Sequence, residues 1–191
     1  SLAGSFRRRR PMKTKTQPRG LRIVSGDLWA YWSNGNPIVI PTNIGWTYTH
    51  PMKNVMGKGL AKQATSKIRD LAEWYGVICC HCREATPVID YDCGFTKGPL
   101  LLFPTKPLNP DQPYLSWSGP ATIQQIAFST TSLRLLVNIK YHVLKFPVCL
   151  PLVGCGNGGL DKEIVLDALN RLIPDSEKQN YLIVDSHGDV S

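Results

Sequence analysis

Glycine is concentrated in two short stretches of this sequence, each directly before a helical pattern. Residues 151–163 read PLVGCGNGGLDKE, with four glycines in six positions, and residues 54–61 read NVMGKGLA. Glycine weakens any regular element, so its abundance at these places points to a close approach of a ligand to the backbone. A loop without Cβ atoms at a helix N-terminus lets a phosphate reach backbone N–H groups and the positive end of the helix dipole. Two such loops predict a diphosphate site.

The elements that position these loops follow from the hydrophobic pattern. We expect strands at 21–27, 37–43, 76–80, 87–91, 98–106, 146–153 and 180–185 and helices at 59–76, 121–144 and 161–173. Gly76 is the predicted end of the first helix. Strands that alternate with helices predict an α/β fold, a three-layer α/β/α sandwich around a largely parallel sheet.

In such a sheet, ligands bind beyond the carboxyl ends of the strands. Asp27 ends the first predicted strand, Asn43 ends the second, Lys106 ends the strand at 98–106, and a glycine stretch follows the strand at 146–153. We therefore expect these features along one edge of the sheet.

Two other interpretations of the glycines stay open at this point. They could serve turn geometry alone. The spacing Gly154-x-Gly156-x-x-Gly159, with Asp185 after the next strand, also matches a dinucleotide fingerprint. That fingerprint normally opens a domain with several βα units after it, and Asp185 stands close to the end of the sequence. We therefore do not expect a dehydrogenase.

Three motifs resemble those of the macro domains, which bind ADP-ribose. VSGDLW (24–29) resembles the family's turn whose aspartate contacts the adenine amine. IVIPTN followed by NVMGKGLA is similar to the asparagine and glycine-rich loop that hold the distal ribose, and PLVGCGNGGLD resembles the loop that wraps the diphosphate. The resemblance covers about residues 21–185 and implies an ADP-ribose site formed by Asp27, Leu28, Asn43, Asn54, Val55, Met56, Gly57, Gly59, Gly154, Cys155, Gly156, Asn157, Gly158, Gly159 and Leu160.

Within this family, NVMGKGLA, LLFPTK and GCGNGGLD together look like the hydrolase branch, which includes the terminal ADP-ribose protein glycohydrolase and the DNA-ADP-ribosylation antitoxin. The resemblance implies that Lys106 and Asp161 are catalytic and that ADP-ribose is removed from a DNA base or a protein. A binding-only reader of ADP-ribose and a phosphatase acting on ADP-ribose 1″-phosphate remain alternatives. No cofactor and no metal are expected.

The chemistry of these two residues is physically reasonable. A neutral lysine amine can attack the ring-opened anomeric carbon of ADP-ribose to form a Schiff base, and desolvation lowers the pKa of a lysine. Asp161 stands at a helix start, where the dipole favours a carboxylate that can act as a base. The plainer alternatives are a surface lysine or phosphate contact for Lys106 and an ordinary N-cap for Asp161.

Two segments depart from the family pattern. IGWTYTHPMK (44–53) lengthens the loop after Asn43, and PLNPDQPYLSWSG (107–119) follows Lys106, where the DNA-directed antitoxin is expected to have a basic and aromatic run. Their aromatic residues Trp46, Tyr48 and Trp117 could stack on a base or on adenine, and loop packing explains them equally well.

The net charge of +8 lies at one end of the chain. Eight of the 22 basic residues fall between Arg7 and Arg22, before any acidic residue, which leaves 14 basic against 14 acidic side chains. We expect a disordered basic tail at 1–20 and one macro-like domain at 21–191. The tail could bind nucleic acid by charge, or Met12 could be the true start.

The remaining expectations concern compartment and partners. No segment approaches the roughly 20 apolar residues of a membrane span. The six cysteines lie mostly in apolar surroundings, which favours a reducing, cytoplasmic compartment. The CCHC run at 79–82 lacks a second pair at zinc-site spacing, so we expect no metal there. We expect a monomer that binds ADP-ribose or an ADP-ribosylated macromolecule, with nucleic acid as a possible partner.

Overall fold

The computed structural model describes residues 20–141 and 145–186, so nearly all of the basic tail predicted at 1–20 lies outside the described residues. The strands are β1 (Arg22–Ser25), β2 (Ile38–Asn43), β3 (Ile89–Tyr91), β4 (Leu100–Lys106), β5 (Val148–Leu150) and β6 (Tyr181–Asp185). The α-helices are α1 (Leu28–Ser33), α2 (Gly59–Lys67), α3 (Leu71–Cys82), α4 (Ile123–Lys140) and α5 (Lys162–Leu172). Short 3-10 turns are η1 (Arg83–Ala85), η2 (Pro113–Ser118) and η3 (Lys178–Asn180).

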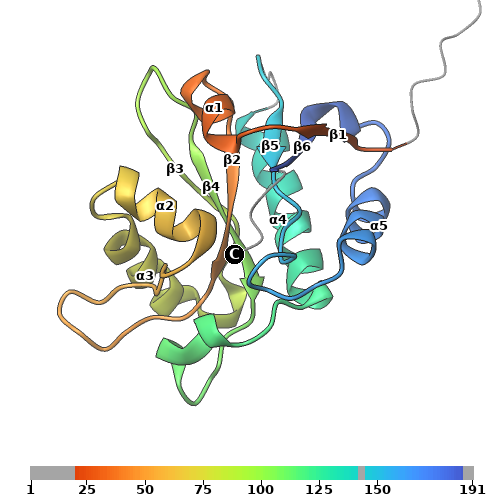
Figure 1. Ribbon diagram of the computed structural model, residues 1–191. Coiled ribbons are helices and arrows are strands. Elements are labelled where there is room, and N and C mark those ends of the chain that lie inside the picture. The colour runs from red at the N-terminus through yellow and green to blue at the C-terminus, as the bar shows by residue number, and fades with distance from the viewer. Residues whose placement is uncertain (1–19, 142–144, 187–191) are drawn as a thin grey trace, which may run out of the picture.

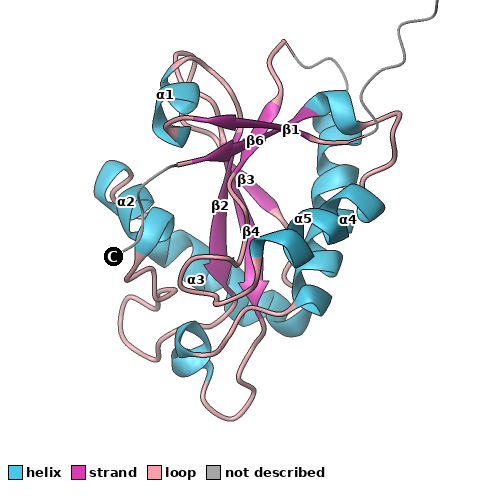
Figure 2. Cartoon of the chain, turned by 45° about the vertical axis from the view of Figure 1, so that its right-hand side comes forward, coloured by secondary structure: helices cyan, strands magenta, loops and turns pink. Residues whose placement is uncertain are grey.

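The six strands form one sheet in the order β1-β6-β5-β2-β4-β3. All neighbours are parallel except β3, which pairs antiparallel with β4 at the edge. Figures 1 and 2 show α1, α2 and α3 on one side of this sheet and α4 and α5 on the other. The predicted three-layer α/β/α sandwich with a largely parallel sheet is therefore confirmed.

Alternation of side chains along the central strands explains why their sequences are continuously apolar. In β2, Ile38 and Ile40 face the core under α1–α3, whereas Val39 faces the core under α4 and α5. Leu101 and Phe103 of β4 likewise join the α4–α5 core, while its other leucines join the opposite one. A strand that is buried on both faces has no polar side, so its pattern predicts a central position.

The predicted single helix at 59–76 and the strand at 76–80 are wrong. The chain leaves the helix at Ile68, whose φ of −129° and ψ of 111° are extended, and α3 begins at Leu71. Gly76 lies inside α3 and does not end a helix. A Cβ atom at Gly76 would lie 2.5 Å from the backbone of Lys53 and Asn54. This glycine therefore lets a loop lie against the helix, and the apolar residues after it continue α3.

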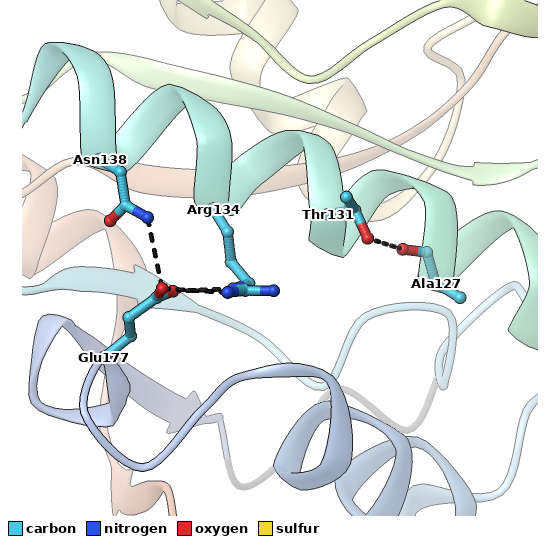
Figure 3. Close-up of polar contacts among 5 residues, drawn as sticks. All are labelled: Ala127, Thr131, Arg134, Asn138 and Glu177. Carbon is cyan, nitrogen blue, oxygen red and sulfur yellow. Dashed lines mark hydrogen bonds and ion pairs between the residues drawn. The ribbon is translucent and has the colours of Figure 1, made fainter.

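A carboxylate clamp holds α4 to the segment that leads into β6 (Figure 3). Arg134 donates from Nε to Glu177 at 2.7 Å and from a terminal nitrogen at 3.0 Å, and Asn138 donates to the same carboxylate at 3.3 Å. The bidentate geometry is the strong form of an ion pair.

None of the helices in the described ranges is long and apolar enough to cross a membrane.

Candidate functional site

The features predicted to meet at one sheet edge do so because five strands run in the same direction. Along that edge, Asp27 follows β1, the loop 151–161 follows β5, and Asn43 and Lys106 end β2 and β4. Asn43 and Lys106 are register partners across the two strands. The loops after β2, β4 and β5 leave at the same end of the sheet in Figure 1. The edge therefore carries an acidic group at one end, a glycine loop near the middle and a lysine at the other.

Two buried asparagines shape the first loop, residues 44–58. Asn43 donates from Nδ2 to the Val55 carbonyl at 2.8 Å and accepts from the Gly45 N–H at 2.9 Å. Asn54 donates to the backbone carbonyls of Asn43 and Gly45 at 3.0 and 2.7 Å. Asn54 Oδ1 is buried, and no donor among the described residues reaches it. Side-chain amide hydrogen bonds, in place of a helix or strand, thus hold this loop at the end of β2.

The second glycine loop closes on itself through three backbone bonds. Cys155 donates to Leu152, Gly159 to Gly156 and Leu160 to Gly154, at 3.0–3.2 Å. Within the described part of the chain, the N–H groups of Gly156, Asn157 and Gly158 donate to no backbone oxygen. Successive N–H groups without a backbone partner in a turn are suited to bind an anion.

The glycines of the two loops make room for different things. A Cβ atom at Gly57 or Gly156 would meet nothing within 4 Å. One at Gly158 would lie 2.4 Å from the Gly154 carbonyl and 2.6 Å from the Ala121 side chain. Gly158 is thus required by the fold itself, whereas the space beside Gly57 and Gly156 is open to a ligand. The expectation that all these glycines serve phosphate approach needs this correction.

The two loops approach each other at the start of α2. Gly59 has a φ of +55°, and a Cβ atom built on it would lie 3.4 Å from Nδ2 of Asn157. The N-terminus of α2 therefore stands beside the tip of the second loop. A ligand on that loop would meet the positive end of α2 as well.

Both predicted carboxylates cap helices. Asp27 accepts from the Trp29 N–H at 2.9 Å at the start of α1. Asp161 Oδ1 accepts from the N–H groups of Glu163 and Ile164 at 2.9 and 3.2 Å at the start of α5. The expected N-cap role of Asp161 is confirmed. Each cap uses one carboxylate oxygen, so the other oxygen of each exposed side chain can serve a ligand.

The chain leaves β4 at Lys106, and a long segment then brings it back beside the same strand. The Thr122 N–H donates to the Thr105 carbonyl at 3.1 Å, which closes the segment 106–121 at its base. Lys106 Nζ donates to the Trp117 carbonyl in this segment at 2.7 Å. The side chain is half-buried, and desolvation, followed by the charge of Lys58, lowers the pKa of Lys106 below its usual value. A lowered pKa increases the neutral fraction of the amine.

The aromatic residues of the two long segments divide into one core residue and two exposed ones. Trp46 is only 3% exposed, so it cannot stack on a ligand base as proposed from the sequence. Tyr48 and Trp117 are exposed, and Tyr48 packs edge-to-face against Tyr114 at 6.3 Å between ring centroids. Sequence reasoning missed Tyr114 and Lys58. The signal for Lys58 was its place between the two glycines of the first loop.

Only comparison of structures relates this chain to known proteins. No family model matches the sequence, and no curated protein matches it significantly. Among solved structures, the macrodomain of Mycobacterium tuberculosis DarG aligns with a TM-score of 0.63 and 22% identity over 86% of this chain and 95% of that one. This chain has a macrodomain fold.

Two further structures agree with that assignment. The macrodomain of Thermus aquaticus DarG aligns with a TM-score of 0.64 and 22% identity over 87% of this chain and 97% of that one. Thermosipho africanus DarTG, solved in complex with ADP-ribose, aligns with a TM-score of 0.63 and 21% identity, and the match covers 88% of this chain and 42% of that one. The macrodomain fold therefore extends over most of the chain.

Proposed function

We propose that this macrodomain binds ADP-ribose and hydrolyses the bond that joins it to a modified macromolecule. The observation that carries the proposal is Lys106, a half-buried lysine at a strand end with a lowered pKa, beside Asn43 and close to two open glycine loops. A lowered pKa favours the neutral form of the amine, which a contact with a phosphate does not need. A nucleophile does need it.

The order of groups along the sheet edge fits an extended ADP-ribose. Its adenine would lie at Asp27, where the free carboxylate oxygen can accept from the exocyclic amine. Its diphosphate would lie over the open N–H groups of the second loop, and its distal ribose would reach Asn43, Asn54 and Lys106. Asn54 is only 1% exposed, so its part would be to hold the loop through its bonds to the Asn43 and Gly45 carbonyls.

The proposed reaction uses the neutral amine of Lys106 as nucleophile. The Nζ–H···O bond to Trp117 holds one amine hydrogen and leaves the lone pair free to attack. Attack at the anomeric carbon of the ring-opened sugar forms a C–N bond while the bond to the substrate breaks, and the substrate leaves with a proton. Water then adds to the imine carbon, and the C–N bond breaks to release ADP-ribose and regenerate the lysine. The free oxygen of Asp161 accepts the proton that this water gives up.

The modified molecule is proposed to be a DNA base or a protein. The exposed rings of Tyr48 and Trp117 lie on the segments next to Lys106 and can stack on a base.

All six cysteines are free thiols, which supports a reducing compartment such as the cytoplasm.

The test offers ADP-ribosylated DNA and ADP-ribosylated protein to the wild type, Lys106→Ala and Lys106→Arg, and measures ADP-ribose release. Borohydride added during turnover should reduce the imine and leave a covalent adduct on Lys106 of the wild type. Both variants should lose adduct and turnover, since a guanidinium is effectively never deprotonated. Wild-type turnover by Lys106→Ala would overturn the lysine mechanism. A wild type that binds ADP-ribose and releases none from either substrate would be a reader.

A further inference from the structure

Lys58 and Lys106 meet at a single tryptophan. Lys58 stands at the end of the first loop, directly before α2, and its Nζ lies 5.9 Å from the centroid of the Trp117 ring. The carbonyl of the same Trp117 accepts from Lys106 Nζ at 2.7 Å. Lys58 of the first loop and Lys106 at the end of β4 therefore both lie against Trp117, although like charges repel.

The first loop packs against the segment 106–121, and this packing holds Lys58 beside Trp117. A Cβ atom at Gly45 would lie 2.0 Å from the Pro113 carbonyl, so the first loop presses directly on η2. The Tyr48 and Tyr114 rings add an edge-to-face contact at 6.3 Å. Lys58 does not cap α2 through its side chain, so its ammonium group is not committed to holding the helix.

We propose that Lys58 is a positioning residue for the hydrolase reaction, whose ammonium beside Trp117 opposes protonation of the Lys106 amine and so favours its reactive form. This inference rests on the proposed function. It assigns a chemical task to a residue that belongs to neither the catalytic pair nor the predicted ADP-ribose contacts.

The described elements next to Lys106 carry several other polar or titratable side chains. The partner strand β2 presents Asn43, which carries no charge. The segment after Lys106 contributes Asp111 and Tyr114, and the second glycine loop ends at Asp161. Of these groups and Lys58, only the charge of Lys58 lowers the pKa of Lys106, in addition to desolvation. A nearby positive charge disfavours protonation of a lysine, so the direction agrees with the proposed role.

A bound diphosphate makes this role more important. Its negative charges would favour the protonated form of Lys106 and so suppress the nucleophile. Lys58, at the N-terminus of α2 beside the tip of the second loop, would offset them. The same ammonium therefore opposes protonation of Lys106 both before and after the ligand binds.

The experiment compares Lys58→Gln, which removes the charge, with Lys58→Arg, which keeps it, and with Lys62→Gln as a matched control one turn along α2. The first readout needs no substrate: the rate of trace acetylation of Lys106 is followed against pH by mass spectrometry. The second readout is the pH profile of kcat/KM for ADP-ribose release. In Lys58→Gln, both profiles should shift to higher pH. Activity lost near neutrality should return in alkali, and Lys58→Arg and Lys62→Gln should follow the wild type.

Each outcome separates this inference from the proposed function. Hydrolysis by Lys58→Gln that is slow at every pH, with an unmoved acetylation profile, would overturn the inference and indicate a plain contact with substrate. A shift in Lys62→Gln as large as that in Lys58→Gln would also overturn it. A shifted acetylation profile in a protein whose wild type releases nothing would support the charge coupling and overturn the hydrolase.

Discussion

Single carboxylate oxygens carry much of the specificity that we propose for this site. Asp27 and Asp161 both cap a helix with Oδ1 and leave a second oxygen at the sheet edge. A cap is worth about 1 kcal/mol, so an alanine substitution at either position mixes lost stability with lost ligand contact. The amide of asparagine can still cap through its oxygen, but it replaces the second acceptor with a donor. This difference separates structural and ligand roles at one position.

Asp27→Asn should weaken ADP-ribose binding while leaving the melting temperature near that of the wild type. The adenine amine would then face a donor in place of a carboxylate oxygen. Loss of a charged hydrogen bond costs about 1.5–3 kcal/mol, which is roughly 10- to 150-fold in Kd. Calorimetry with ADP-ribose and a thermal melt on the same preparation measure both effects. Asp27→Ala is the comparison and should lose stability as well. Unchanged affinity in Asp27→Asn would remove this residue from the site.

At the scale of elements, the sequence predicted the strands and helix ends that depend on a local pattern. It did not predict those that depend on a contact between residues far apart in the sequence. The apolar runs of β2 and β4 and the helix start at Asp161 are local signals, and each was predicted correctly. Gly76 was misread as a helix end because its purpose is contact with the backbone of Lys53 and Asn54, which lie more than twenty positions earlier in the sequence. The order of the strands and the meeting of Lys58 with Trp117 are also long-range. No pattern within a short window encodes them.

The second glycine loop offers a direct test of structural against ligand roles. Gly156→Val should keep the melting temperature near that of the wild type and abolish most ADP-ribose binding, because its Cβ enters open space where the diphosphate is proposed to lie. Gly158→Ala should lower the melting temperature, since its Cβ would overlap Gly154 and Ala121. Overpacking of this kind costs about 1–3 kcal/mol. Wild-type affinity in a well-folded Gly156→Val protein would contradict a phosphate site on this loop.

For the whole molecule, charge and site are separated along the chain. The net charge of +8 comes from basic residues clustered before Asp27, and the rest of the sequence is balanced. The proposed site draws its affinity for an anion from loop N–H groups and helix N-termini. Long-range attraction of the basic segment is screened over about 10 Å in ordinary salt. ADP-ribose binding and nucleic-acid attraction should therefore be independent properties.

Deletion of residues 1–19 tests this separation. The truncated chain should bind ADP-ribose with the affinity of the full chain, because the proposed contacts all lie between Asp27 and Asp161. Its affinity for single-stranded or duplex DNA should fall, and the dependence of log K on log salt should become shallower, since fewer phosphate counterions are released when seven basic side chains are removed. Fluorescence anisotropy at several salt concentrations measures the slope, and calorimetry measures the ADP-ribose affinity. The full chain with the four arginines at 7–10 changed to glutamine is the matched control, because it keeps the length and removes four of the seven charges. If the truncated protein binds DNA as tightly and with the same slope, the folded part must carry its own phosphate-binding surface, and the balanced charge count would not describe how that surface is arranged.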